Sequence, residues 1–171
     1  MSELGLIFKA SEGKRCDSYR LGGAIVDYDA ITSKWRMWYY CRDRGFDGPP
    51  TLGTGYIAHA ISDDGVSWTR VEGKEALGSV LAPNPDKSAF DSVHVGLTDI
   101  TRGAGEWLMW YFGGDTRPQK TEAPFLGDAV VGLGMRPGLA RSKDGVEWER
   151  VPGPRISGAL FDYPDEDMYV A

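Results

Sequence analysis

The sequence predicts an all-β fold made of many short antiparallel strands, and three observations support this prediction. Glycine accounts for 23 of the 171 residues, nearly twice its usual share of about 7%, and it breaks helices. The chain also contains 6 tryptophans, 8 tyrosines and 6 phenylalanines, which favour strands. Finally, two copies of one sequence pattern follow each other at a period of about 75 residues, which is room for four short strands per copy.

The composition argues against several functional classes. The net charge is −6, whereas a nucleic-acid groove or a polybasic membrane patch needs a local excess of basic residues. No apolar run reaches the length of about 18 residues that a membrane-spanning helix requires. The N-terminal residues show no apolar signal segment, so we expect an intracellular location, either cytoplasmic or organellar. We therefore expect neither nucleic acid nor membrane insertion among the interactions of this chain.

The repeat is visible in two pairs of segments. The aromatic run 35–40 returns at 107–112, an offset of 72, and the run 62–71 returns at 142–151, an offset of 80, with seven of ten positions identical. All six tryptophans lie in these segments, three in each copy. The change in offset predicts an eight-residue insertion between the second and third strands of copy two.

Each copy is predicted to form four antiparallel strands, which is typical of a propeller blade. The predicted strands are 21–27, 34–41, 55–62 and 66–71 in copy one, and 93–99, 106–113, 138–142 and 146–151 in copy two. Gly114 to Pro137 is predicted to be a loop, and Asp27 matches Asp99 at an offset of 72 near the end of the first strand. The predicted fold is thus a partial β-propeller of two four-stranded antiparallel blades within a single domain, 1–171. Blade one covers about 16–73, blade two about 89–153, and a third blade begins at 159–171.

The Asp-Gly steps predict a two-residue hairpin turn between the third and fourth strands of each blade. The tryptophan three residues after each glycine is expected to fold over the hairpin and pack between blades. We therefore interpret six residues as structural turn residues: Asp64, Gly65, Trp68, Asp144, Gly145 and Trp148.

The segment 138–148, with the pattern G-x-A-x-S-x-D-G-x-x-W, resembles the hairpin of five-bladed β-propeller glycosidases. The pattern Phe90-Asp91-Ser92 followed by the aromatic run 107–112 resembles the same group. That group contains the family 43 arabinanases and xylosidases, the family 32 invertases, the levansucrases and the related mannoside phosphorylases. The resemblance covers about residues 16–151 and implies a propeller architecture.

The resemblance also implies where catalytic carboxylates belong. Family 43 enzymes place a general base Asp at the start of the first innermost strand, and their general acid is a Glu in a later blade. Here the corresponding stretches are 22–25 and 95–98, and neither contains a carboxylate. We therefore predict no catalytic residues, and catalysis by this chain alone is not expected.

Polar residues at one rim of the blades are the candidate site. The loop before the first strand and the loop after the second strand lie on the same rim of an antiparallel blade, which gathers Asp17, Tyr19 and Arg20 with Arg42, Asp43 and Arg44. The repeat of Asp17-Ser18 is Asp91-Ser92. The predicted sugar-binding residues are Arg42, Asp43, Asp91, His94, Asp115 and Arg117. The alternative for each of them is a structural role: solvated loop charge, a turn-forming Asp, or a satisfied histidine.

Cys16 and Cys41 are interpreted as reduced core thiols, and the sequence predicts no metal site and no cofactor. The resulting hypothesis is a glycoside-hydrolase-like propeller module that recognises carbohydrate. The alternative is a non-catalytic structural or scaffold subunit in a larger complex. Because open blade edges expose unpaired backbone groups, we also expect a like chain or a partner protein to cover them.

Overall fold

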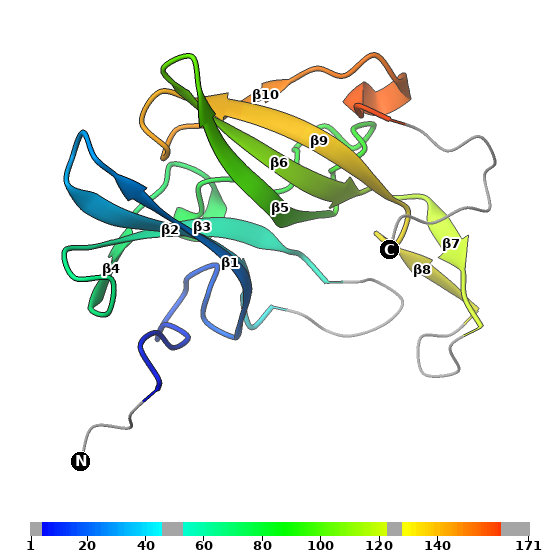
Figure 1. Ribbon diagram of the computed structural model, residues 1–171. Helices are drawn as coiled ribbons and strands as arrows, with labels where there is room; N and C mark the ends of the chain where they lie inside the picture. Colours follow the sequence, from blue (N-terminus) through cyan, green and yellow to red (C-terminus); the bar gives the residue numbers. More distant parts are fainter. Residues whose placement is uncertain (1–4, 46–52, 123–127, 162–171) are drawn as a thin grey trace.

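The computed structural model of the chain describes residues 5–45, 53–122 and 128–161. It contains two four-stranded antiparallel sheets and one small two-stranded sheet (Figure 1). The first sheet consists of β1 (Arg20–Asp29), β2 (Lys34–Arg42), β3 (Tyr56–Ser62) and β4 (Trp68–Val71). The second consists of β5 (His94–Gly103), β6 (Glu106–Gly114), β9 (Met135–Ser142) and β10 (Glu149–Val151). The predicted all-β fold with two four-stranded antiparallel blades is therefore confirmed.

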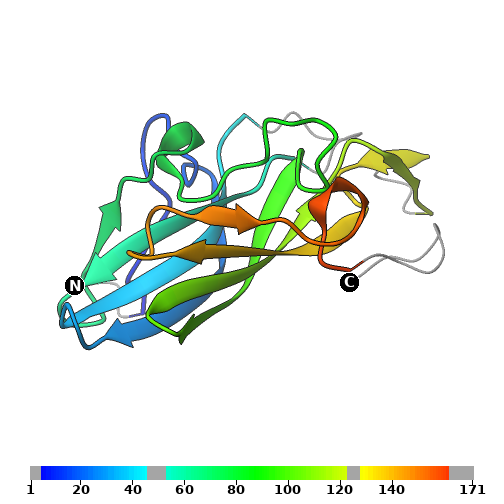
Figure 2. The ribbon, with the colours of Figure 1, turned by 90° about the horizontal axis from the view of Figure 1, so that it is seen from above.

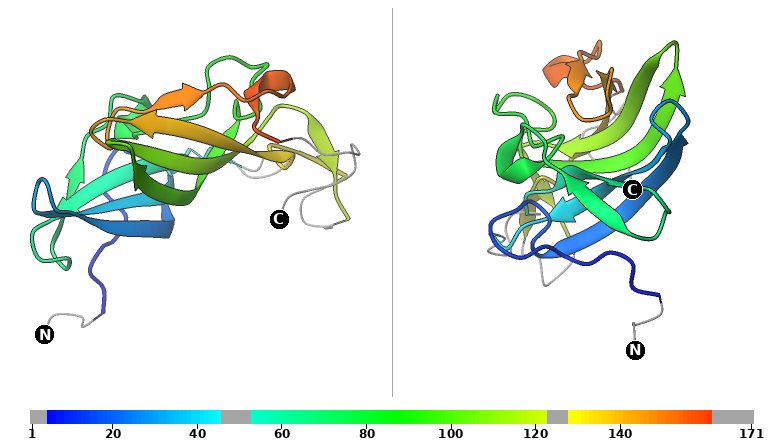
Figure 3. Two further views of the ribbon diagram at one scale, coloured as in Figure 1. Left: turned by 45° about the horizontal axis from the view of Figure 1, so that its top comes forward. Right: turned by 90° about the vertical axis from the view of Figure 1, so that its left-hand side faces the viewer.

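Both sheets have the strand order of a propeller blade, since each strand pairs with the next one of its own copy. The first strands of the two blades, β1 and β5, also contact each other. Figure 3 shows the two sheets stacked and splayed relative to one another. Stacking of this kind lets each blade bury a face that it could not bury alone.

The insertion in blade two is a small hairpin where the sequence analysis expected only a loop. Strand β7 (Pro118–Lys120) pairs with β8 (Ala129–Val131) between β6 and β9. This hairpin projects from the end of the molecule opposite β4 (Figures 1 and 2). Its strands are only three residues long, too short for an alternating pattern to mark them in the sequence.

The pairing register corrects the predicted match between Asp27 and Asp99. Asp27 lies opposite Arg36 in blade one, whereas the residue opposite Leu108, the equivalent of Arg36, is Thr101. The true offset in the first strands is therefore 74. The offset becomes 72 in the second strands because the β5–β6 hairpin is two residues shorter than the β1–β2 hairpin.

The Asp-Gly hairpins form, but their connections are longer than two residues. Strand β3 ends at Ser62, which pairs directly with Trp68. The carboxylate of Asp64 accepts the backbone N–H groups of Val66 and Ser67 at 2.8 and 2.6 Å. These bonds curl the chain into a turn of the kind that Asp side chains stabilise, and so the fourth strand begins later than predicted.

The main core lies between the two blades and is centred on Trp38 of β2. Its side chain is fully buried, and its ring lies 4.9 Å from that of Trp107 on β6 and 6.4 Å from that of Trp148. The Trp38 indole N–H donates a hydrogen bond of 2.7 Å to the carbonyl oxygen of Gly145 in the β9–β10 turn. The blade-two turn is thus fixed to blade one by packing and by a buried hydrogen bond.

Asp29 links the blades electrostatically at the end of β1. Its carboxylate accepts hydrogen bonds from Arg36 of blade one at 3.0 Å and from Arg102 of blade two at 2.7 Å. Burial raises the pKa of Asp29, but bonds from Arg102, Thr32 and the Ile31 N–H outweigh it and hold the pKa well below its usual range. The carboxylate is therefore ionised and serves both blades.

A second core lies on the far face of blade one. It contains Cys16 and Cys41, which are buried free thiols, together with Met37 and Tyr39. Phe8 of the N-terminal segment packs edge-on against Tyr39, with ring centroids 5.1 Å apart. The two cysteines thus act as small core residues, as predicted, and burial raises the pKa of the Cys41 thiol.

The connection after each blade repeats in detail. Gly73 donates its N–H to the carbonyl of Gly78 at 3.0 Å, and Gly153 donates to Gly158 at 2.9 Å. Both connections contain a short 3-10 turn, η1 (Ala76–Gly78) and η2 (Ile156–Gly158). Residues 153–161 therefore correspond to 73–81, the connection to the next blade. The proposed third blade at 159–171 lies mostly outside the described residues.

His59 of β3 produces a testable pH dependence at the blade interface. It is buried and stacked on Trp38 with ring centroids 5.0 Å apart, and both ring nitrogens are buried without a hydrogen-bond partner among the described residues. Burial, aided by the charge of Arg36, lowers its pKa to about 3. The unfolded chain then binds more protons than the native one, so the stability is complete above the unfolded pKa of about 6.5 and falls as the pH drops towards 3.

We expect His59→Leu to flatten this decline, because blade two carries Leu139 at the equivalent position. Urea unfolding at about pH 7 and about pH 4.5 measures the effect, and the variant should lose about 2–3 kcal/mol less than the wild type between them. Some decline remains, since the pKa of His94 is also lowered to about 4. Equal losses in variant and wild type contradict the prediction.

Among the described residues, no helix is both long and apolar enough to cross a membrane.

Candidate functional site

The predicted rim exists, because the strand ends that should form it lie together in each blade. In blade one, the start of β1 pairs with the end of β2 through Arg20 and Arg42. In blade two, His94 at the start of β5 pairs with Gly114 at the end of β6, which pairs with Met135 at the start of β9. The rim therefore gathers side chains that are distant in the sequence.

His94 joins the two halves of the rim. Its Nδ1 lies 3.0 Å from the carbonyl oxygen of Gly53 in blade one. Its ring lies 5.6 Å from that of Tyr40 and 5.7 Å, in a stacked orientation, from that of Phe112. Burial lowers its pKa to about 4, with a further contribution from the charge of Arg42, although the Gly53 carbonyl opposes the shift. His94 is thus a neutral, buried ring that holds the blades together beneath the rim.

Arg42 and Tyr40 form the blade-one part of the rim. The Arg42 guanidinium donates a hydrogen bond to the Tyr40 hydroxyl and lies 5.6 Å from the centre of its ring. Burial raises the pKa of Tyr40, and Arg42 counteracts part of that shift. Asp43 follows at the end of β2 and is half-buried. Close by in the sequence, Tyr19 is exposed and the Arg20 guanidinium lies 5.1 Å from its ring centre.

Asp115 and Arg117 form the blade-two part of the rim. The buried Asp115 carboxylate accepts the Arg117 backbone N–H at 2.9 Å and its side-chain Nε–H at 2.8 Å. Arg136 at the start of β9 also donates to Asp115, at 3.3 Å. Arg117 remains 55% exposed in its side chain, so this pair presents a fixed, solvent-accessible guanidinium at the rim.

Sequence reasoning missed Arg136. Its equivalent in blade one is Tyr56, because Tyr56 pairs with Cys41 as Arg136 pairs with Gly113. The repeat therefore carried no sign of an arginine at this position. The only available signal was its place just before the recognisable 138–148 motif.

Asp91 lies beneath the rim rather than on it. It is fully buried, and its Oδ2 accepts hydrogen bonds from the Tyr111 hydroxyl at 3.0 Å and from Arg150 Nε at 2.7 Å. In this structure, its carboxylate fastens the chain before β5 to β6 and β10. Asp91 therefore offers no exposed oxygen to a ligand.

Asp17 makes the same arrangement in blade one. Tyr39 donates its hydroxyl to Asp17 at 3.0 Å and Arg70 donates its Nε–H at 2.6 Å. Burial raises the pKa of Asp17, but bonds from Ser11, Arg70 and Tyr39 outweigh it, so the pKa lies below its usual value. Each blade thus carries one buried Asp–Tyr–Arg triad, which the sequence showed only as matching letters.

The predicted turn residues lie in the two hairpins, away from the rim. Asp144 accepts the N–H groups of Val146 and Glu147 at 2.8 and 2.9 Å, as Asp64 does in blade one. Trp148 packs against the inter-blade core, and its indole donates to Gly145 at 3.1 Å. Trp68 packs instead against the second core of blade one.

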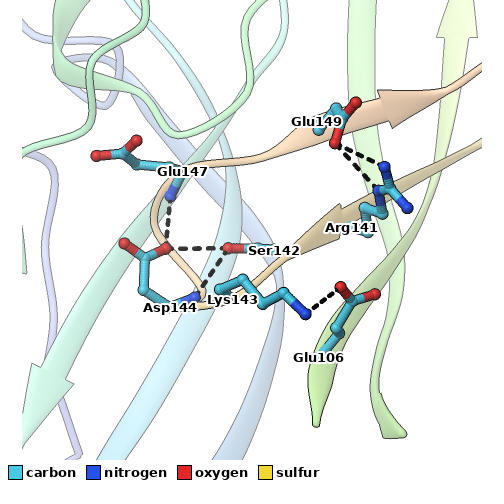
Figure 4. Close-up of a pocket in the computed structure, with 7 residues that line it drawn as sticks. All are labelled: Glu106, Arg141, Ser142, Lys143, Asp144, Glu147 and Glu149. Carbon is cyan, nitrogen blue, oxygen red and sulfur yellow. Dashed lines mark hydrogen bonds and ion pairs between the residues drawn. The ribbon is translucent and has the colours of Figure 1, made fainter. Parts of the chain in front are cut away.

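A shallow pocket lies at the opposite end of blade two from the rim (Figure 4). It is lined by Glu106, Arg141, Ser142, Lys143, Asp144, Glu147 and Glu149. Lys143 pairs with Glu106, and Arg141 pairs with Glu149 at 3.0 Å. Because these charges neutralise one another, the pocket does not present the fixed, exposed charge that the rim presents. No group of residues in the described part of the chain could hold a metal ion.

The fold is similar to that of solved glycoside hydrolases. The chain matches a solved complex of BT0996 and RGII with a TM-score of 0.51 at 22% identity, over 78% of this chain and 37% of the other. A structure described as a glycoside hydrolase matches with a TM-score of 0.54 at 19% identity, over 86% and 39%. A structure from work on mannoside phosphorylases and glycoside hydrolases of the GH130 family, which target β-1,2 mannosidic linkages in Candida mannan, matches with a TM-score of 0.50 at 15% identity, over 93% and 58%.

The chain therefore spans about two fifths of the length of the first two structures. At these identities, the likeness concerns the fold. No family model matches this chain, and no curated protein sequence matches it.

Proposed function

We propose that this chain is a glycoside-hydrolase-like β-propeller module that recognises carbohydrate at the rim and does not hydrolyse it alone. The fold likeness to glycoside hydrolases supports the carbohydrate class. Within the predicted group, families 43 and 32 are the relatives that the hairpin motif favours. The observation that carries the proposal is the pair of Asp115 and Arg117, in which a buried carboxylate fixes an exposed guanidinium.

Such a pair suits a sugar, because a guanidinium held in one orientation donates several hydrogen bonds to neighbouring hydroxyl groups. Tyr19, with Arg20 beside its ring, offers an exposed aromatic face on the blade-one side of the rim. Arg42 and Asp43 lie between the two and complete the proposed surface. The predicted contributions of Asp91 and His94 become indirect, since both side chains lie buried beneath it.

The proposal excludes catalysis by this chain because the carboxylates near the rim are engaged. Glycoside hydrolysis requires one carboxylic acid with a raised pKa and a second carboxylate across the scissile bond. Asp17 has a lowered pKa, and Asp91 and Asp115 are each bound to arginine. These carboxylates act as hydrogen-bond acceptors inside the fold rather than as proton donors.

Arg117→Ala tests the proposal. A glycan array followed by isothermal titration with the best ligand should show affinity reduced about five- to tenfold, the loss of one charged hydrogen bond. Arg141→Ala is the matched control, because Arg141 is 50% exposed and paired with Glu149 at the opposite end of the blade. The proposal fails if no glycan binds, or if both variants bind as tightly as the wild type.

A further inference from the structure

The contact between the two blades has a repeat-related counterpart on the outside of the molecule. Inside, Trp38 of blade one is 0% exposed and Trp107 of blade two is 2% exposed. Their repeat equivalents, Trp110 of blade two and Trp35 of blade one, are each 37% exposed. The repeat thus places the same residue type on an inner face of one blade and on an outer face of the other.

A pair of aliphatic residues follows the same rule. Ile100 of blade two lies opposite Met109 and is 8% exposed. Val26 occupies the equivalent position opposite Met37 in blade one and is 48% exposed. The outer face of blade one therefore has the apolar character of the blade-two face that packs inside the chain.

The hairpin turns show the same relation. Gly145, which accepts the Trp38 indole N–H, is buried, whereas Gly65 in the equivalent turn is half-exposed. Their φ angles of 77° and 75° are nearly identical, so the two turns have matching backbone conformations. Val66, next to Gly65, is also exposed, while Val146 packs against the core.

The outer face of blade two is an apolar stripe. Direct partners across an antiparallel pair share a face, and Trp110 lies opposite Leu139 while Phe112 lies opposite Pro137. Leu108 lies on the same side of β6. All five side chains are partly exposed, so the stripe is open to a partner.

We propose that this stripe binds the outer face of blade one in a second copy of the chain, repeating the contact between blades one and two. In that interface the Trp110 indole donates to the Gly65 carbonyl of the second copy, as Trp38 donates to Gly145 within the chain. A second copy is the favoured occupant because the chain itself carries both halves of the contact. Each half has a related version that already packs in this structure.

The interface is head-to-tail, since the two halves lie on different blades. A head-to-tail contact propagates until it closes into a ring or forms a filament. A closed ring needs about two to four copies, because propellers hold roughly four to eight blades.

Sedimentation velocity over a range of concentrations tests the interface with Trp110→Glu and Val66→Glu, which place a charge on opposite halves. The wild type should self-associate, and either variant alone should remain monomeric, with association weakened at least about tenfold. An equimolar mixture of the two should form dimers and nothing larger, because each variant retains one intact half. Ile31→Glu is the control: Ile31 is 81% exposed at the β1–β2 turn and should assemble normally.

Near-ultraviolet circular dichroism establishes that each variant is folded. A wild type that stays monomeric up to about 100 µM, well above the dissociation constant of a specific interface of standard size, overturns the proposal. So does assembly that both variants retain, or a mixture in which no dimer appears. Glycan binding of the monomeric variants is a separate measurement, because neither substitution lies at the rim.

Discussion

Replacing Asp91 with Ala should destabilise the protein by about 3–5 kcal/mol, the usual cost of removing one partner of a buried ion pair. The Asp91 carboxylate is fully buried and holds both Arg150 and the Tyr111 hydroxyl. Without it, the Arg150 guanidinium stays largely enclosed and keeps only the Ala82 carbonyl as an acceptor among the described residues, and the Tyr111 hydroxyl loses its acceptor. Urea unfolding at neutral pH measures the loss.

Asp63→Ala is the control for that experiment. Asp63 also pairs with a basic residue, Lys34, but its side chain is almost entirely exposed, so the expected change is within about 0.5 kcal/mol. The double variant Asp91→Ala/Arg150→Met should recover part of the loss, since it removes the uncompensated charge as well. Equal stability of the Asp91 and Asp63 variants is incompatible with a structural triad.

Replacing Trp38 with Ala should cost a similar 3–5 kcal/mol, about the range for deleting a buried aromatic side chain. Trp38 contacts Trp107, Trp148 and His59, and its indole N–H satisfies the Gly145 carbonyl. Its loss leaves a cavity in the contact that holds the blades together. Thermal and urea unfolding measure the effect.

The repeat supplies the matched control, Trp110→Ala. It makes the same chemical change at the equivalent strand position, but on an outer face where more than a third of the side chain is exposed. At concentrations where the chain is monomeric, we expect a loss of less than about 1.5 kcal/mol. If the two variants lose equal stability, burial between the blades is not the source of the Trp38 effect.

The sequence predicted the strands well where the repeat supported them. Each of the eight blade strands has at least one boundary within one residue of its predicted position, because aromatic runs and turn residues mark them locally. The β7–β8 hairpin was missed since it lies in the insertion and has no second copy. The fourth strands begin late because the Asp64 and Asp144 carboxylates extend each turn through hydrogen bonds.

The candidate site was predicted less completely because it depends on burial. The sequence placed Asp115 beside Arg117 and both at the rim, as the structure has them. It could not show that Asp91 lies beneath that rim, since the partners of Asp91 are 20 and 59 residues away. Only packing of β6 and β10 brings Tyr111 and Arg150 to that carboxylate.

Two surface ion pairs with reversed charges favour correct pairing of the repeated strands. At the end opposite the rim, blade one joins Lys34 of β2 to Asp63, and blade two joins Glu106 of β6 to Lys143 at the equivalent positions. If a folding chain paired β2 with β9, Lys34 would meet Lys143; if it paired β6 with β3, Glu106 would meet Asp63. Both exchanges bring like charges together. Two hairpins with nearly the same sequence are prone to exchange strands, and this reversal of charge gives each strand a reason to choose its own neighbour.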